Sequence, residues 1–307
     1  MSTQPIAEYQ PTRPAQPRWL RVRTLRMHLH EWGQATPGMP SLVLLHGWMD
    51  VGASFQFVVD ELAALEGPGR HVVAPDWRGF GLTTGPAVDS YWFPDYLADL
   101  DTLLDALDPA APVDLVGHSM GGNIAMSYAG VRPQRVRRLV NLEGFGLPAT
   151  SASQAPSRLR RWLDELREPP LLRAYADLPA VAERLRKTNP RLAADMAQWL
   201  ARQWARQGDD GRWHLQADPA HKRSNPVLYR VEEVLAAWAA ITAPLLWVEG
   251  DGTDMATWWG HRYAREEFLQ RLSVVPDCRR ARLADAGHML HHDQPRALAE
   301  RLLDFLG

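Results

Sequence analysis

The sequence predicts an α/β fold with a mostly parallel central sheet, helices on both faces of that sheet and a helical cap insertion. Three observations lead to this prediction. Short, fully apolar runs alternate with amphipathic segments up to residue 147, the alternation stops over residues 148–239, and it then resumes to the end of the chain. Fully apolar strands are typical of parallel sheets whose two faces are both covered by helices.

The N-terminal part of the chain divides into a tail and an edge hairpin. Residues 1–17 contain four prolines and few apolar side chains, which predicts a flexible tail. The β-like segments 19–24 and 26–32 follow closely on each other and predict a hairpin at the edge of the sheet.

The core domain is expected to comprise residues 18–147 and 240–307. Its apolar runs predict further strands at 41–45, 71–76, 112–116, 137–142, 244–248 and 280–283. Helices are expected between and after these strands, and in the one at 96–107 the leucines recur at three- and four-residue spacing. These helices are predicted at 53–65, 96–107, 121–129, 263–272 and 296–305.

The insertion at residues 148–239, called the cap below, is rich in tryptophan, arginine and leucine. Its pattern predicts helices only, at 158–167, 178–187, 193–207 and 231–240. Because the insertion interrupts the core between two strands, we expect it to lie over one edge of the sheet.

Charge and composition exclude several classes of protein. A formal net charge of −2 over 307 residues gives no basic field for nucleic acid or an anionic membrane. The single cysteine, Cys278, cannot form an internal disulfide or a zinc site of several thiolates, and it indicates a reducing compartment. The sequence shows no secretory signal and no stretch of roughly 18–20 apolar residues. We therefore expect a cytoplasmic monomer or homodimer that acts on a small molecule without a cofactor.

The segment Gly117-His118-Ser119-Met120-Gly121 contains the strongest chemical signal in the chain. It has the G-x-S-x-G pattern, and it stands between a predicted strand and a predicted helix, as that pattern requires. The turn is so sharp that both flanking positions must be small, and it lifts the serine hydroxyl clear of the sheet. Ser119 is therefore the predicted nucleophile, and it needs a base to activate it.

The loop after the strand at 41–45 reads His46-Gly47-Trp48 and is the expected second half of an oxyanion hole. In this geometry one N–H donor comes from that loop and the other from the residue after the nucleophile. We therefore predict the backbone N–H groups of Trp48 and Met120 as the donors. The imidazole of His46 is expected to brace the loop.

The predicted base is His288, because it follows the last strand and comes last in chain order. Gly287 gives the backbone the freedom to turn the ring toward Ser119. His291 and His292 could join His288 in a metal cluster, but no carboxylate stands beside them at metal spacing. We therefore expect no metal site, and we expect these two histidines to be solvated or to cap the loop.

Two loops could supply the carboxylate that orients the base. Glu143 stands directly after the strand at 137–142, where the cap begins. Asp251 and Asp254 stand after the strand at 244–248. The residues themselves leave this choice open. Glu143 is the first candidate, Asp254 is the main alternative, and Asp251 is the third.

Taken together, four motifs resemble the α/β-hydrolase superfamily, in the form of a serine hydrolase with a helical cap: His46–Trp48, Asp76–Gly81, Gly117–Gly122 and Gly287–His288. The resemblance covers roughly residues 20–147 and 240–307, while the cap matches only in position and helical character. It implies the same roles for Ser119, His288, Met120 and Trp48. It also implies that Arg78 braces the region of the nucleophile.

The sequence departs from the usual family pattern at the acid. Many relatives have a glycine, two further residues and an aspartate in the late loop, but this spacing from Gly250 leads to Thr253. Other members, such as some haloalkane dehalogenases, take the acid from the loop where Glu143 stands. Dehalogenases and epoxide hydrolases of this fold use an aspartate nucleophile, so Ser119 disfavours both of those reactions.

A serine nucleophile with a histidine base and oxyanion donors predicts hydrolysis of a carboxylic ester through an acyl-enzyme. An aromatic cap predicts an apolar substrate, such as a short- or medium-chain or aryl ester. The expected pocket residues are His118, Phe145, Trp162 and Trp258, with Trp199 and Trp204 as further candidates. The alternatives are a carbon–carbon bond hydrolase, a lactonase, an amidase, an acyltransferase and a non-catalytic ligand receptor on the same fold.

Overall fold

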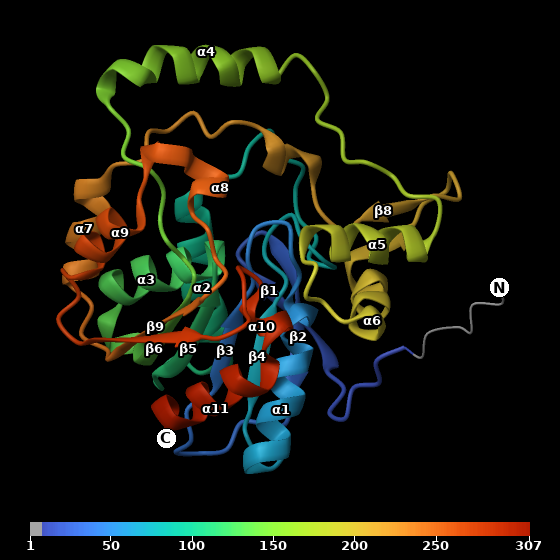
Figure 1. Cartoon of the computed structure of the whole chain (residues 1–307), viewed down its shortest axis with the longest axis vertical. Coiled ribbons are helices and arrows are strands. Elements are labelled where there is room, and N and C mark those ends of the chain that lie inside the picture. The colour runs from blue at the N-terminus through green and yellow to red at the C-terminus, as the bar shows by residue number, and fades with distance from the viewer. Residues whose placement is uncertain (1–7) are drawn as a thin grey trace.

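A computed structural model describes residues 8–307 of the chain (Figure 1). Its centre is an eight-stranded sheet in the order β1-β2-β4-β3-β5-β6-β9-β10. β1 pairs antiparallel with β2, and β2 pairs antiparallel with β4, whereas every pair from β4 to β10 is parallel. This confirms the predicted sheet. The strands are β1 (Gln16–Val22), β2 (Leu25–Trp32), β3 (Leu42–Leu45), β4 (Val72–Pro75), β5 (Val113–His118), β6 (Val136–Leu142), β9 (Leu245–Gly250) and β10 (Cys278–Leu283).

Helices cover both faces of the sheet, because successive side chains of a strand point to opposite faces. In β3, Val43 and Leu45 contribute to one buried cluster, and Leu42 and Leu44 contribute to the other. The cluster around Leu42 is completed by α1 (Gln56–Glu66) and α11 (Pro295–Leu306). The opposite cluster is completed by α2 (Phe93–Leu107), α3 (Met120–Val131), α7 (Val231–Ala239) and α9 (Arg265–Leu272).

Short helices connect several of these elements. The two α-helical ones are α8 (Ala256–Trp259), after β9, and α10 (Leu290–Asp293), which directly precedes α11. The 3-10 helices are η1 (Gly52–Phe55), η2 (Pro133–Arg135), η3 (Ala152–Gln154), η4 (Pro219–Lys222) and η5 (Gly260–Arg262). None of the helices within residues 8–307 is both long and apolar enough to span a bilayer.

The segment before β1 is held against the core. The Tyr9 hydroxyl donates to Asp60 Oδ2 at 2.5 Å, and the backbone N–H of Arg13 donates to Asp60 Oδ1 at 2.7 Å. Asp60 lies buried on α1, so these donors satisfy a carboxylate that would otherwise lack partners. The flexible tail predicted for residues 1–17 is therefore wrong from residue 8 onward, and residues 1–7 lie outside the described part of the chain.

The cap contains a small sheet as well as helices. α4 (Ala155–Glu165) runs across the top of the molecule in Figure 1, while α5 (Leu178–Thr188) and α6 (Ala194–Trp204) pack together at one side. The chain after α6 forms the antiparallel pair β7 (Ala205–Gln207) and β8 (Trp213–Leu215). The prediction of helices only is wrong here, because the turn residues Gly-Asp-Asp-Gly at 208–211 favour a hairpin.

The end of the cap also differs from the prediction. The predicted boundary placed α7 in the cap, but α7 packs against α3. Its Trp238 is 1% exposed and belongs to the buried cluster of the core. The packing of an amphipathic helix is decided by the surface that it meets, and the apolar pattern of the helix alone does not reveal that surface.

Candidate active site

Ser119 occupies the turn between the end of β5 and the start of α3, two elements that are labelled in Figure 1. Its backbone has φ 52° and ψ −114°, a conformation that L-residues rarely adopt. The Ser119 N–H donates to the carbonyl of Leu142, at the end of the neighbouring strand β6. This bond and the following helix hold the serine in its strained position.

The glycines around Ser119 allow three segments of backbone to pass close together. A Cβ atom on Gly117 would collide with the carbonyl oxygen of Gly121. A Cβ atom on Gly121 would collide with the carbonyl oxygen of Leu45, at the end of β3. These contacts give the physical reason for the small residues of the G-x-S-x-G pattern.

We expect Gly121→Ala to destabilise the fold by about 3 kcal/mol or more, because rigid backbone would have to move to admit the methyl group. The matched control is Gly69→Ala, since no atom lies within 4 Å of a Cβ there. That control should change the free energy of unfolding by about 1 kcal/mol or less. Urea unfolding of both variants measures the difference, and equal effects would contradict this account of the turn.

His288 lies in the loop between β10 and α10, and its ring connects two of the predicted site residues. Its Nε2 atom is 3.0 Å from Ser119 Oγ, and its Nδ1 atom is 2.8 Å from Glu143 Oε2. The side chain of His288 is 28% exposed, whereas that of Glu143 is fully buried. The ring can therefore reach a substrate, while its partner carboxylate is shielded from water.

Glu143 follows β6 in a backbone conformation with φ 57°. Its Oε1 atom accepts hydrogen bonds from the Gly250 N–H at 2.7 Å and the Thr253 hydroxyl at 2.6 Å. Burial raises the pKa of Glu143 to about 7, against the lowering effect of these two hydrogen bonds. Thr253, which stands where the family pattern places an aspartate, thus supports the carboxylate of Glu143.

The other two candidate acids point elsewhere. Asp254 is exposed, and its side chain accepts a hydrogen bond from the Ala256 N–H at the start of α8. Asp251 is also exposed and accepts a hydrogen bond from the Ala286 N–H. Both carboxylates shape turns, so Glu143 is the one candidate of the three whose carboxylate contacts His288 among the described residues.

Sequence reasoning missed the supporting role of Thr253 and Gly250. The only available signal was the offset in the late loop, where a hydroxyl stands in place of the usual carboxylate. The structure also shows that Arg78 binds Asp99 on α2, with Nη2 2.7 Å from Oδ1. It therefore holds α2, and the role that the resemblance implied for it near the nucleophile is not what this chain shows.

The loop after β3 packs directly against the nucleophile. A Cβ atom on Gly47 would lie 3.2 Å from the Cβ of Ser119, so the backbone of this loop comes within contact distance. His46 braces the loop, because its Nε2 accepts a hydrogen bond from the Trp77 N–H at 3.0 Å. Trp48 follows with its side chain 52% exposed, and Met120 is the first residue of α3.

Backbone strain is concentrated around this site. Among the described residues, five that are not glycine have a positive φ. Four of them lie in the loops that carry the candidate groups: Met49, Ser119, Glu143 and Asp285. Strained backbone persists only where the surrounding structure enforces it, and it is typical of functional sites.

The predicted pocket residues separate into two groups. Trp258 is 40% exposed and its ring lies 4.6 Å from that of His288, with Phe145 behind it at 6.2 Å. Phe145 and Thr253 also line a cavity of about 340 Å³. His118, by contrast, is buried, and its Nε2 donates to the carbonyl of His288 at 2.7 Å. It supports the loop at 284–289 that carries His288, called the base loop below, and it does not line an open pocket.

The tryptophans of the cap mainly connect the cap to the core. The Trp162 indole donates to the Ser90 hydroxyl at 2.7 Å, which ties α4 to the segment before α2. Trp199 packs edge-on against Phe57 of α1, with ring centroids 5.6 Å apart. Trp204 donates to Asp50 Oδ1 at 3.0 Å. The prediction that Trp199 and Trp204 line the pocket is therefore wrong, because both hold the cap to the core.

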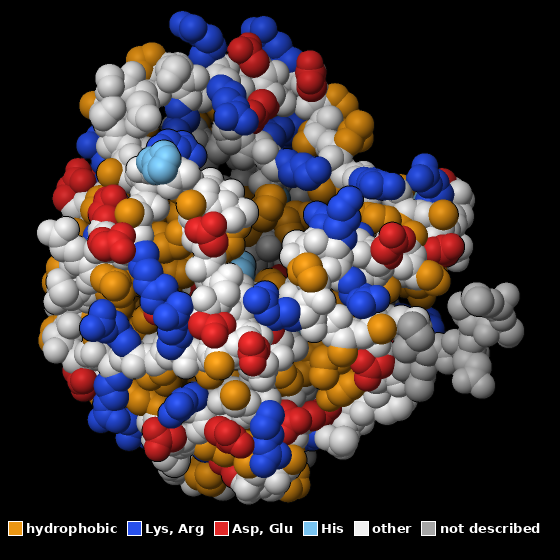
Figure 2. Space-filling model, viewed as in Figure 1, with side chains coloured by type: hydrophobic (Ala, Val, Ile, Leu, Met, Phe, Trp, Pro, Cys, Tyr) orange, Lys and Arg blue, Asp and Glu red, His pale blue; other side chains and the backbone are white. Residues whose placement is uncertain are grey.

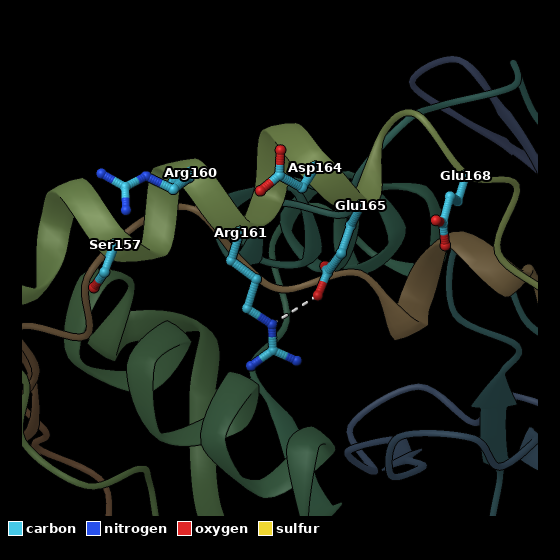
Figure 3. Close-up of a pocket in the computed structure, with 6 residues that line it drawn as sticks. All are labelled: Ser157, Arg160, Arg161, Asp164, Glu165 and Glu168. Carbon is cyan, nitrogen blue, oxygen red and sulfur yellow. Dashed lines mark hydrogen bonds and ion pairs between the residues drawn. The ribbon is translucent and has the colours of Figure 1, made fainter.

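The molecular surface is hollowed beneath α4, and hydrophobic side chains gather around this hollow (Figure 2). α4 itself is strongly charged. Figure 3 shows Arg161 pointing away from α4 and pairing with Glu165, with 2.7 Å between Nε and Oε1. A shallow cavity of about 350 Å³ is lined there by Ser157, Arg160, Arg161, Asp164, Glu165 and Glu168. The hollow therefore combines an apolar rim with a charged helix above it.

His291 and His292 are buried, contrary to the expectation that they are solvated or cap the loop. They are 0% and 4% exposed, and their rings pack against Phe55 and Phe57. Burial lowers the pKa of both imidazoles well below the ordinary value. The polar character of these two residues predicted that they would be exposed. They are buried because α10 packs between the base loop and the helices η1 and α1.

Comparison with known proteins identifies the family. The family model of the alpha/beta hydrolase fold matches residues 40–295. The chain therefore belongs to this family.

Three similar proteins illustrate the range of its relatives. A serine hydrolase-like protein of Danio rerio is 26% identical over 90% of this chain and 83% of its own length. A 3-hydroxybutyrate-oligomer hydrolase of Cupriavidus necator is 31% identical over 89% of this chain and 90% of its own length. The solved thioesterase domain from the curacin biosynthetic pathway has a TM-score of 0.81 at 28% identity, covering 94% of this chain and 99% of that one.

Proposed function

We propose that this hydrolase cleaves carboxylic esters through an acyl-enzyme on Ser119. The observation that carries the proposal is the continuous contact from Ser119 Oγ through the ring of His288 to the buried carboxylate of Glu143. Such a series of contacts activates a serine. The imidazole takes the proton of the serine hydroxyl, while the carboxylate holds the ring in the required tautomer.

Each step of the reaction has an assigned group. Ser119 Oγ attacks the ester carbonyl as its proton moves to His288 Nε2, and the oxyanion is held by the N–H groups of Trp48 and Met120. His288 then gives the proton to the departing alcohol, which leaves an acyl group on Ser119. Water repeats the sequence, with His288 again as the base, and releases the acid.

The surroundings favour an apolar acyl or alcohol group. Trp258 presents an exposed aromatic face next to His288, and Phe145 extends the apolar surface behind it. Two of the relatives are named for action on acyl compounds, since an oligomer of a hydroxy acid is joined by ester bonds and a thioesterase cleaves a thioester. Both names agree with acyl transfer to water as the reaction of this site.

A panel of substrates tests the proposed specificity. We expect short- and medium-chain p-nitrophenyl esters to be hydrolysed with a higher kcat/KM than charged esters, sugar esters, simple amides or vinylogous diketones. Faster cleavage of the charged or sugar esters would contradict the apolar pocket. Faster cleavage of a vinylogous diketone would instead identify a carbon–carbon bond hydrolase that uses the same serine.

A further inference from the structure

Three buried side chains come together behind the base loop. Asp50 lies in the loop after β3, two residues beyond Trp48, while His291 and His292 lie on α10, shortly after His288. One potential ligand atom from each of the three lies within 4.8 Å of the other two. Their side chains are buried, with exposures of 3%, 0% and 4%. The group was hidden in the sequence, because Asp50 stands far from the two histidines along the chain.

The hydrogen bonds of Asp50 all fall on one oxygen. Oδ1 accepts from the Val51 N–H at 2.8 Å, from the Ser54 hydroxyl and from the Trp204 indole at 3.0 Å. Among residues 8–307, no donor reaches Oδ2. This oxygen is directed at the histidines, since His291 Nε2 is 3.7 Å away. A buried carboxylate oxygen without a partner is costly, so its surroundings call for a positive or donating group.

The two histidines also lack hydrogen-bond partners. Neither ring nitrogen of His291 has a hydrogen-bond partner within the described residues, and His292 Nε2 also lacks one. The distance of 3.7 Å between Asp50 Oδ2 and His291 Nε2 is too long for a hydrogen bond. It is close to the separation of about 3.4 Å between two ligands that each lie about 2.1 Å from a tetrahedral ion.

We propose that Asp50, His291 and His292 form a binding site for a divalent transition-metal ion such as Zn²⁺. One carboxylate oxygen and two imidazole nitrogens form a ligand set that zinc and its neighbours in the first row accept, with water as the fourth ligand. The ion would link the loop that carries Trp48 to the helix that follows His288. The proposal is independent of the proposed function, because it is tested by metal binding.

A second cluster in the same molecule shows what distinguishes this site. His28, His30 and Asp76 also place one potential ligand atom each within 4.8 Å of the others. However, Asp76 Oδ2 is 2.8 Å from His28 Nδ1, and Asp76 Oδ1 accepts from the Gly52 N–H at 2.8 Å. Both oxygens of Asp76 are satisfied by the protein, so this cluster has no need of an ion and we assign none to it.

Zinc binding to the full chain is the direct test. The protein is stripped of metal with a chelator, the chelator is removed, and Zn²⁺ is titrated against a colorimetric zinc indicator. We expect one ion per chain, and anomalous scattering at the zinc edge in crystals of the parent protein should place it between the three side chains. An ordered water at that position, or zinc bound only at the surface, would overturn the proposal.

Variants separate this site from adventitious binding. Asp50→Asn and His291→Gln each remove one ligand, and each should weaken zinc binding by roughly a hundredfold or more, since changes outside the ligand set alone cost about 10- to 100-fold. The matched control is His214→Gln, because His214 is an exposed histidine beside the carboxylate of Asp210. That variant should bind zinc as the parent does. Equal loss in all three variants, or no loss in the first two, would contradict the assignment, and the parent crystals decide the matter if a variant does not fold.

Discussion

Replacing Ser119 with alanine should lower kcat for ester hydrolysis by about a millionfold while leaving the fold intact. The substitution removes the atom that forms the acyl-enzyme, and the oxyanion donors and His288 cannot replace it. Ser119 is partly exposed at the start of α3 and its hydroxyl bonds to His288, so alanine leaves no large cavity. Initial rates with a p-nitrophenyl ester measure the loss.

The control for this prediction is Ser273→Ala. Ser273 is exposed at the end of α9, and its hydroxyl donates only to the nearby carbonyl of Gln270 among the described residues. The Ser273→Ala variant should hydrolyse the ester at the same rate as the parent. A Ser119→Ala variant that is folded and retains more than a few per cent of the parent kcat would show that a different group attacks the ester.

Replacing Glu143 with glutamine should lower kcat by about ten-thousandfold, the effect expected when the base is held in the wrong tautomer. The amide oxygen will stay with the donors of Gly250 and Thr253, which already bind Oε1. The amide NH₂ then faces His288 Nδ1, which must become the acceptor. The ring proton moves to Nε2, where it blocks proton transfer from Ser119.

The pH profile provides a second readout for the same variant. Activity requires a neutral His288, so the rate falls when the pH drops through the pKa of the His288–Glu143 pair. Burial lowers the pKa of His288 to about 4 and raises that of Glu143 to about 7. The pair therefore takes up a proton at a higher pH than the imidazole of His288 would alone. In Glu143→Gln the acid limb of kcat/KM should move to lower pH, because the imidazolium loses its carboxylate partner.

Asp254→Asn is the matched control for the acid. Asp254 was the main alternative in the sequence, but its carboxylate is exposed and forms part of the turn into α8. We expect its kcat and its acid limb to match those of the parent. If Asp254→Asn lost activity while Glu143→Gln kept it, the assignment of the acid would be wrong.

The core of the fold was predictable because its signals are local. The apolar runs of β3, β5 and β9 and the sharp turn at Ser119 are each encoded within a few consecutive residues. The hairpin of β7 and β8 was missed, although its turn residues stand in the sequence, because the helix predicted at 193–207 was extended through β7. The tail was misjudged because the partner of Tyr9, Asp60, lies on a helix that is distant in the chain.

The site was predictable only in part, for the same reason. The motifs at Ser119 and His288 indicate their groups directly, and their chemical roles stay predictions until they are assayed. The choice of Glu143 depended on a contact with Thr253, which lies 110 residues further along the chain. Likewise, the burial of His291 beside Asp50 is a through-space relation, so the sequence indicated a solvated loop where the structure has a closed polar cluster.

Covalent labelling with a fluorophosphonate, read by mass spectrometry of the digested protein, tests the central claim most directly. We predict stoichiometric labelling of the parent chain on the peptide that contains Ser119. Labelling should be lost in Ser119→Ala and in His288→Ala, which removes the base. A folded parent that takes up no label, or takes it up on another residue, would contradict the assignment of an activated serine at position 119.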